Sequence, residues 1–243
     1  MPHSAANSSH LADEAVITRV LDEAITRFSR FGFQDTKLED LSKAVGMSKR
    51  MIHYHFGDKQ GLYEQALKTA ALRLNPSPEE LQIDTSVPVD GVRKLINLIF
   101  ERHHSHREEI RMLIRATSRP PHEVPLPRPL TDYSEISLHL NKLLILGQDA
   151  GAFRPGISST DVFVLISGLT MYAGANKHMI NNLFGVDIVD TDNVSGLQRM
   201  ATDTVLAFLT ANIPNSGHAS YLITDQGEDD SDNPEMYSDA VYH

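Results

Sequence analysis

The sequence contains no cysteine and no tryptophan among its 243 residues, and only 7% of the residues are aromatic. The absence of cysteine excludes disulfide bonds, thiol nucleophiles and cysteine-ligated zinc sites. No apolar run approaches the ~18 residues that suggest a membrane-spanning helix. The first ten residues have neither a basic start nor an apolar stretch, so they do not resemble a secretory signal. We therefore expect a cytoplasmic protein with no membrane partner.

Negative charge is unevenly distributed along the chain, whose formal net charge is -10. Residues 213–243 contain seven acidic side chains and no Lys or Arg, whereas residues 1–75 contain ten basic and nine acidic side chains. The N-terminal third can therefore present a local basic surface to a polyanion, although the whole chain is acidic. The acidic segment shows no helical period and is expected to be disordered.

Apolar residues recur with helical spacing along most of the chain, and no segment shows the alternation of a β-strand. From Asp13 onward, Val16, Val20, Ala24 and Phe28 repeat every four residues. Gly32 follows this stripe and suits a left-handed C-cap. The chain is therefore predicted to be all-α. Later helices are expected at about 59–74, 90–104, 107–118, 130–149, 159–184 and 193–212, and five prolines exclude a continuous helix over 120–129.

Residues 36–59 contain two short helical segments with a tight turn at residues 46–48. Thr36 is expected to cap the first segment, with Glu39 completing a capping box, and Ser48 is expected to cap the second. The first segment is too short to be stable alone, so it must pack against its neighbours. This arrangement predicts a helix-turn-helix, whose second helix can enter the major groove of double-stranded DNA.

A longer set of residues surrounds this turn at fixed spacing, namely Gly32-Phe33, Thr36, Leu38, Asp40-Leu41, Ala44, Gly46, Ser48, Ile52, Tyr54-His55-Phe56, Lys59 and Leu62. Their combined spacing, within about residues 13–62, resembles the DNA-binding domain of the TetR (tetracycline-repressor) family. The chain departs from the family pattern at Lys37, Ser42, Arg50 and His53. Arg50 and His53 lie on the expected DNA face, and we interpret them as changes specific to one operator.

The resemblance implies that DNA contacts come from the positions where the family contacts DNA backbone or bases, which are occupied here by Lys37, Lys49, Tyr54, His55 and Lys59. Arg50 can bond a guanine edge bidentately, and His53 can contact phosphate or base more weakly. Lys49 begins the second helix, whose N-terminus also attracts phosphate. His55 has an equally plausible alternative as a packed histidine beside Phe56. The expected DNA-binding residues are Thr36, Lys37, Ser48, Lys49, Arg50, His53, Tyr54, His55 and Lys59.

The resemblance also implies a second helical domain that binds a small organic effector and forms a homodimer, so that two recognition helices read a palindromic operator. The chain then divides into a disordered N-terminus (1–11), a DNA-binding domain (12–75), an effector-binding and dimerisation domain (76–212) and the acidic tail (213–243). Candidate effector contacts are polar residues on otherwise apolar segments: Arg111, Arg115, Tyr133, His139, Tyr172, Asn176 and His178.

The segments 149–155, 176–178 and 184–187 are similar to a branch of the family found near aromatic-catabolism genes. This similarity favours an aromatic or phenolic effector. The leading interpretation is a repressor that the effector releases from DNA, with effector-promoted DNA binding as the alternative.

Three alternatives accompany this interpretation. His103 and His106 have the i, i+3 spacing of a chelating pair. Cationic histidines at a solvated helix terminus explain them more simply. We therefore expect no metal or other cofactor. A helical hydrolase or lyase using histidine is disfavoured, since no G-x-S-x-G, H-E-x-x-H or Gly-rich phosphate motif is present. An adaptor that kept the fold and lost DNA binding is disfavoured by the cluster Lys37, Lys49, Arg50 and Lys59.

Overall fold

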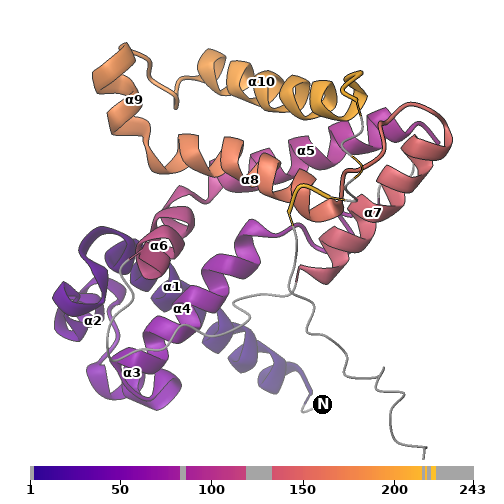
Figure 1. Cartoon of the computed structure of the whole chain (residues 1–243). Helices are drawn as coiled ribbons and strands as arrows, with labels where there is room; N and C mark the ends of the chain where they lie inside the picture. Colours follow the sequence, from indigo (N-terminus) through magenta and orange to yellow (C-terminus); the bar gives the residue numbers. More distant parts are fainter. Residues whose placement is uncertain (1–2, 83–85, 119–132, 215–216, 218–219, 223–243) are drawn as a thin grey trace, which may run out of the picture.

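A computed structural model describes residues 3–82, 86–118, 133–214, 217 and 220–222, without the side chains of residues 3–13 and 134. In this part of the chain the regular structure is helical throughout, which confirms the all-α prediction (Figure 1). The helices are α1 (His3–Asp35), α2 (Leu38–Val45), α3 (Lys49–Phe56), α4 (Lys59–Leu74), α5 (Pro88–Ser105), α6 (Arg107–Ser118), α7 (Ser134–Asp149), α8 (Ser159–Ala175), α9 (Lys177–Phe184) and α10 (Thr191–Thr210).

Helices α1 to α4 enclose the first of two apolar cores. Phe28 on α1 and Tyr63 on α4 meet edge to face, with ring centroids 4.9 Å apart. Leu41 from α2 and Ile52 from α3 are almost fully buried in the same cluster. Each short helix therefore owes its stability to apolar residues packed on α1 and α4, because an isolated eight-residue helix is unstable in water.

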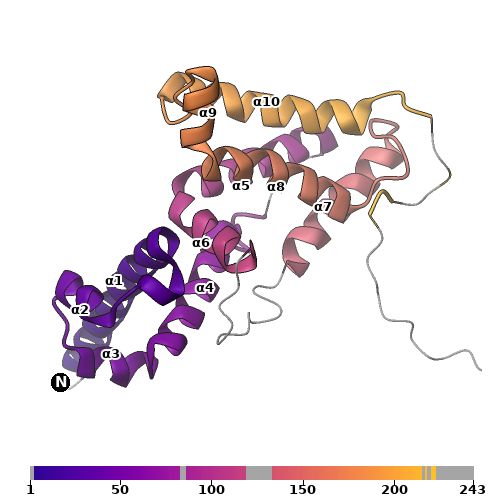
Figure 2. The ribbon, with the colours of Figure 1, turned by 60° about the vertical axis from the view of Figure 1, so that its left-hand side comes forward.

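Helices α5, α7, α8 and α10 form the second core at the other end of the molecule. Leu95 and Ile99 on α5, Leu140 on α7 and Ile166 on α8 belong to this buried cluster. Figure 2 shows α6 between the two groups of helices. Met112 on α6 is buried in the first core, so the segment after residue 76 also contributes to the N-terminal part.

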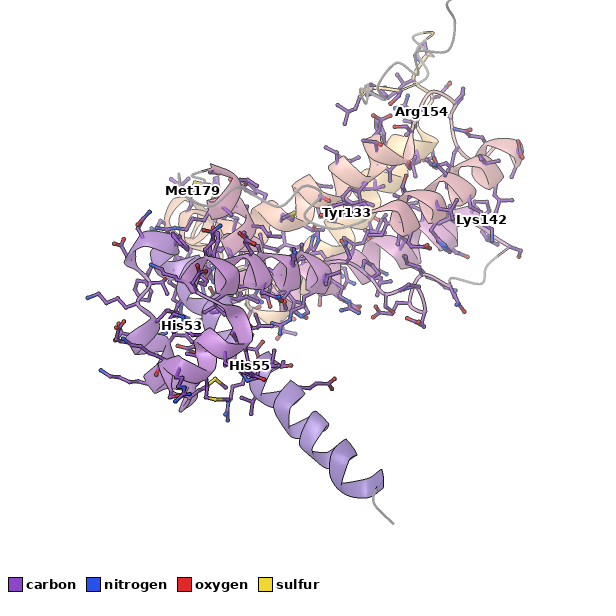
Figure 3. All side chains as sticks on the ribbon, turned by 90° about the horizontal axis from the view of Figure 1, so that it is seen from below. His53, His55, Tyr133, Lys142, Arg154 and Met179 are labelled. Atoms are coloured by element: carbon purple, nitrogen blue, oxygen red, sulfur yellow. The ribbon has the colours of Figure 1, made fainter. Side chains whose placement is uncertain are left out.

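The N-terminal residues correct one expectation. Residues 1–11 were expected to be disordered, but α1 begins at His3, and its N-terminal end projects from the body of the molecule (Figure 3). Once the downstream helix has formed, each added residue gains a backbone hydrogen bond at little cost, so a polar segment can extend it. The segment contains Ala5 and Ala6, which favour this extension.

The single helix expected at 159–184 is also corrected, because it divides at Asn176 into α8 and α9. The Asn176 side-chain amide donates to the carbonyl of Tyr172 at 3.0 Å, and its backbone N–H donates to the same oxygen. Side chains of this type compete with helical hydrogen bonds and favour helix ends. The proline-rich segment 120–129 and most of the acidic tail, 223–243, lie outside the described residues.

Thr36 does not cap α2, contrary to expectation. Its side chain is 2% exposed, and its hydroxyl donates to the carbonyl of Gly32 at 2.7 Å. Gly32 has a positive φ of 81° and kinks α1, and the Thr36 hydroxyl bonds the carbonyl at this kink. The N-cap residue of α2 is Lys37, without a side-chain capping bond.

No helix in the described part of the chain is both long enough and apolar enough to cross a membrane.

His103 joins α5 to α8 inside the molecule. Its Nδ1 lies 2.6 Å from the hydroxyl oxygen of Thr170, and this hydroxyl donates to the carbonyl of Ile166. The hydroxyl therefore accepts from His103, which fixes the proton on Nδ1. Burial, assisted by the nearby His106, lowers the pKa of His103 to about 4.

This lowered pKa predicts a pH-dependent stability. Between pH 6.5 and 4 the unfolded chain binds a proton that the folded chain excludes, so stability falls as the pH decreases through this range. The lowered pKa of His103 accounts for a loss of about 3 kcal/mol in the free energy of unfolding across this pH range. In urea titrations at pH 7.5 and 4.5, His103→Asn should lose less stability on acidification than the wild type. The exposed His178→Asn is the matched control, and an equal loss in wild type and His103→Asn would contradict the assignment.

Candidate nucleic-acid interface

The turn between α2 and α3 is built from a helix end, a glycine and a helix cap. Gly46 adopts the left-handed conformation at φ 66°, and the backbone N–H of Met47 donates to the carbonyl of Ser42. The Ser48 side chain accepts from the backbone N–H of Met51, which confirms the predicted cap of α3. These contacts fix the angle at which α3 leaves α2.

Helix α3 buries one face and exposes the other. Ile52 and Phe56 are buried against the first core, while Arg50, His53 and Tyr54 are exposed. The three exposed residues lie at positions i, i+3 and i+4, so they share one face of the helix. Tyr54 is 79% exposed, which is unusual for a large aromatic side chain in the absence of a partner.

The N-terminus of α3 carries Lys49 and no acidic residue in its first turn. Lys49 forms an ion pair with Glu39 of α2, and both side chains are about half exposed. Such exposed pairs contribute little to stability. Lys49 can therefore exchange Glu39 for an anion at the helix N-terminus, where the backbone dipole also attracts negative charge.

Lys59 is held at the start of α4 rather than extended into solvent. Its Nζ donates to the carbonyl of Gln34 at 3.1 Å and lies 4.7 Å from the centre of the Phe33 ring. Asp58 caps α4 by accepting from the N–H of Gly61. Lys59 thus supports the segment that leads from α1 into α2.

The remaining DNA candidates differ in accessibility. Lys37 is exposed beside α2, and His55 is half-buried with its ring 5.1 Å from that of Tyr54. The buried Thr36 side chain is placed for structure and not for contact with DNA. The structure therefore brings Lys37, Ser48, Lys49, Arg50, His53 and Tyr54 to exposed positions on α2 and α3.

Two family models match most of this architecture. Residues 20–66 match the model described as bacterial regulatory proteins, tetR family, and residues 88–205 match the tetracyclin repressor-like C-terminal domain. The chain belongs to the tetR family. The first match covers the helix-turn-helix, and the second runs from α5 into α10.

Individual proteins agree with this family membership. The chain is 26% identical over 182 residues to the HTH-type transcriptional repressor NicS of Pseudomonas putida, covering 74% of this chain and 86% of that protein. It is 31% identical over 103 residues to the biofilm operon regulator IcaR of Staphylococcus aureus. This match covers 42% of this chain and 54% of that protein. A tetR-family structure from Rhodococcus has a TM-score of 0.59 at 14% identity, covering 80% of this chain and 96% of the other, and therefore supports the fold.

The candidate effector residues of this tetR-family chain do not gather in one place. Arg115 donates to the carbonyls of Arg30 and Phe31 at the end of α1, so it is engaged at the junction with the first core. Arg111 pairs with Glu108 on its own helix. Tyr172, Asn176 and His178 lie at the exposed junction of α8 and α9, and burial lowers the pKa of the partly buried His139 on α7.

Tyr133 is the candidate that lines a substantial pocket. A cavity of about 370 Å³ lies between the starts of α7 and α8. The rings of Tyr133 and Phe163 meet there at 5.1 Å, and burial raises the pKa of Tyr133. Sequence reasoning missed the other lining residues, because apolar spacing does not reveal which two helices meet. They are Ile136, Ser137, Ser159, Thr160 and Phe163.

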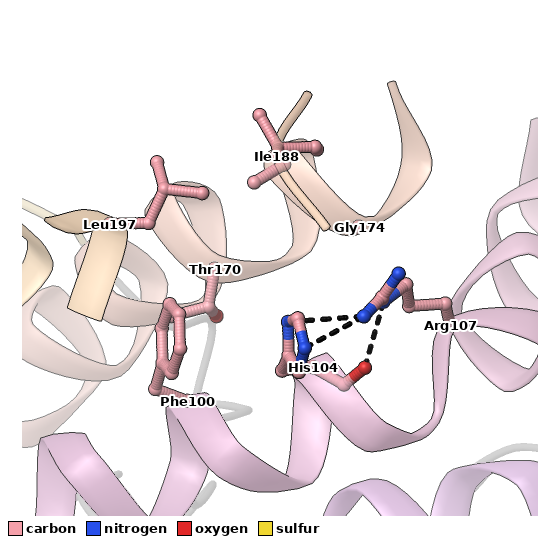
Figure 4. Close-up of a pocket in the computed structure, with 8 residues that line it drawn as sticks. Phe100, His104, Arg107, Thr170, Gly174, Ile188 and Leu197 are labelled. Atoms are coloured by element: carbon pink, nitrogen blue, oxygen red, sulfur yellow. Dashed lines mark hydrogen bonds between the residues drawn. The ribbon is translucent and has the colours of Figure 1, made fainter. Parts of the chain in front are cut away.

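A second pocket, of about 20 Å³, holds little more than one water molecule. Figure 4 shows Phe100, His104 and Arg107 on one side, with Gly174 and Leu197 on the other. The Arg107 guanidinium bonds the carbonyl and the ring of His104, and burial lowers the pKa of both groups.

The histidines near the end of α5 do not form a chelating pair in this arrangement. His103 is buried with its Nδ1 on Thr170, and His106 Nδ1 lies 2.9 Å from the carbonyl of Arg102. Among the described residues, no group of three or more His, Asp or Glu side chains is arranged to hold a metal ion.

Proposed function

We propose that the protein is a homodimeric transcriptional repressor that binds a palindromic operator and is released by a small organic effector. The observation that carries the proposal is the exposed face of α3, where Arg50, His53 and Tyr54 project from a helix with a capped, cationic N-terminus. The similarity to NicS and IcaR, both named as transcriptional repressors or negative regulators, supports this direction of control.

The geometry fits entry of α3 into the major groove. A groove about 12 Å wide admits one α-helix, and the exposed residues of that helix then face base edges. Arg50 supplies the fork of donors that suits guanine, while Lys49, Ser48 and Lys37 suit phosphates. In this proposal Thr36 and Lys59 act indirectly, because they hold the segment between α1 and α2.

A homodimer is proposed through α8, α9 and α10. Val164 and Tyr172 on α8 are each about half exposed, and Gly168 lies between them on the same face. On α9, Leu183 and Phe184 are 66% and 70% exposed. Such exposed apolar side chains on α8 and α9 suit contact with a second copy of the chain.

The effector site is proposed to be the cavity at Tyr133 and Phe163. Its volume of about 370 Å³ lies in the range of small-molecule sites, and its two aromatic rings and serine hydroxyls suit an aromatic or phenolic compound. Release from DNA would follow if the effector binds more tightly to a conformation whose recognition helices are wrongly spaced.

Helix α6 is proposed to connect the effector domain to the DNA-binding domain. Glu108 accepts from the hydroxyl of Ser29 on α1 at 2.6 Å, and Glu109 pairs with Arg73 on α4. Arg115 adds the contact with the end of α1. A shift of α6 would therefore move α1 and α4 together, and with them α3.

Two other functions remain as alternatives, an adaptor that has lost DNA binding and a helical hydrolase or lyase. An electrophoretic shift with the DNA upstream of the protein's own gene separates them from the repressor. A shifted band that resists competitor DNA supports the repressor, and its absence over the micromolar range would contradict it.

Replacing Arg50 by Ala tests the proposed base contact. The variant should lose its preference at one base position in each half-site, a discrimination worth ~1–3 kcal/mol. Binding selection from a randomised duplex library provides the measurement. Lys142→Ala on α7 removes an exposed cation at the opposite end of the molecule and should leave the selected sequence unchanged (Figure 3). An unaltered preference in Arg50→Ala would refute this role.

Replacing Gly168 by Arg tests the proposed dimer. A Cβ atom at this position meets no atom within 4 Å, so the substitution should leave the protomer folded. Light scattering after size exclusion should give the dimer mass for wild type and the monomer mass for Gly168→Arg, with Leu138→Arg on α7 as the control. A monomeric wild type, or a variant that remains dimeric, would speak against this interface.

Filling the cavity tests the effector site. Thr160→Trp should occupy the space beside Phe163 and remove the response to effectors while leaving operator affinity intact. Fluorescence anisotropy of labelled operator, titrated with phenol, catechol and benzoate, measures release. Leu138→Trp adds the same group at an exposed site. If Thr160→Trp is released at the same concentrations as wild type, the effector binds elsewhere.

A further inference from the structure

The His53 side chain is fixed in one tautomer by the end of its own helix. Its Nδ1 lies 2.6 Å from the carbonyl oxygen of Gly57. A carbonyl oxygen can only accept, so Nδ1 carries the proton and donates it. The backbone N–H of Gly57 in turn donates to the carbonyl of His53 at 2.9 Å. These two bonds join the same pair of residues and hold the ring against the C-terminal end of α3.

Gly57 makes this arrangement possible. It has a φ of 77°, a backbone conformation that L side chains rarely adopt, and this turns its carbonyl toward His53. The imidazole is therefore held by the backbone and not by a rotating side-chain partner.

The tautomer decides what the exposed edge of the ring can recognise. With the proton on Nδ1, a neutral imidazole has a lone pair on Nε2 and accepts a hydrogen bond there. Phosphate oxygens, guanine O6 and N7, and thymine O4 are also acceptors, so neutral His53 gains no hydrogen bond from them. In the major groove the complementary donors are the N6 amine of adenine and the N4 amine of cytosine.

We propose that His53 is a specificity-determining residue that accepts a hydrogen bond from the exocyclic amine of an adenine or cytosine in the operator. This inference rests on the proposed function. His53 and Arg50 are three residues apart on the exposed face of α3, about 4.5 Å along the helix axis. Because base pairs are 3.4 Å apart, the two residues read adjacent or nearly adjacent base pairs with opposite chemistry.

Two substitutions of His53 test separately the hydrogen bond to Gly57 and the hydrogen bond to the base. In His53→Asn the amide nitrogen replaces Nδ1 and can keep the bond to Gly57, but the atom that reaches the base is lost. In His53→Gln the longer amide reaches the position of Nε2, where Gln pairs with adenine, and the bond to Gly57 is lost.

The experiment begins with selection of a randomised duplex library by the wild type at pH 8. We expect one position in each half-site where the wild type selects a single base pair, whose adenine or cytosine supplies the amine. In His53→Asn that position should become degenerate while the rest of the selected sequence persists, and His53→Gln should favour adenine there. Circular dichroism melting of each variant checks that α3 still folds.

A base analogue then tests the same contact in the wild-type protein. The selected adenine is replaced by purine, or the cytosine by pyrimidin-2-one, so that only the amine is removed. Wild-type affinity should fall about tenfold, whereas His53→Asn should bind both operators equally.

The outcomes distinguish this inference from the function on which it rests. If the wild type selects no sequence, the repressor proposal fails and this inference fails with it. If the wild type selects an operator but His53→Asn selects the same one, or weakens all sequences uniformly as a lost phosphate contact would, the base-reading role is overturned while the repressor proposal stands. Equal wild-type affinity for amine-containing and amine-free operators also overturns it.

Discussion

The mutual packing of α1, α4 and α6 is the contact on which the rest of the structure depends. Leu62, Ala66 and Leu67 on α4 are fully buried, and Met112 on α6 and Phe28 on α1 are almost completely so. Burial of each of the Leu, Met and Phe side chains in this set stabilises the fold by about 1.5–3 kcal/mol. Helices α2 and α3 have no core of their own, so the position of every exposed residue on α3 follows from this packing.

The same junction is where the two parts of the molecule contact one another. A Cβ atom at Gly32 would lie 2.6 Å from Arg115 Nε, so the absence of a side chain lets the guanidinium approach the end of α1. Arg115 then bonds the carbonyls of Arg30 and Phe31, which directly precede the kink at Gly32. Residues that sequence reasoning assigns to DNA, Thr36 and Lys59, complete the support of this segment.

Local chemistry accounts for what the sequence could predict. Ser48 and Asp58 precede their helices at capping positions, and the apolar spacing of Ile52 and Phe56 identifies the buried face of α3, so the helix-turn-helix follows from neighbouring residues. The sequence could not reveal that Arg115 contacts α1, because the partners lie more than 80 residues apart. The pocket at Tyr133 depends in the same way on how α7 and α8 meet.

The central claim is that two copies of α3 are held at a spacing that DNA recognises. Because the chain has no cysteine, Ala44→Cys on α2 provides one spin label per protomer beside the recognition helix. Double electron–electron resonance should give a narrow distance distribution when the selected operator is added, as recognition helices about 34–36 Å apart require. The absence of dipolar coupling, or a distribution that DNA leaves unchanged, would contradict the account.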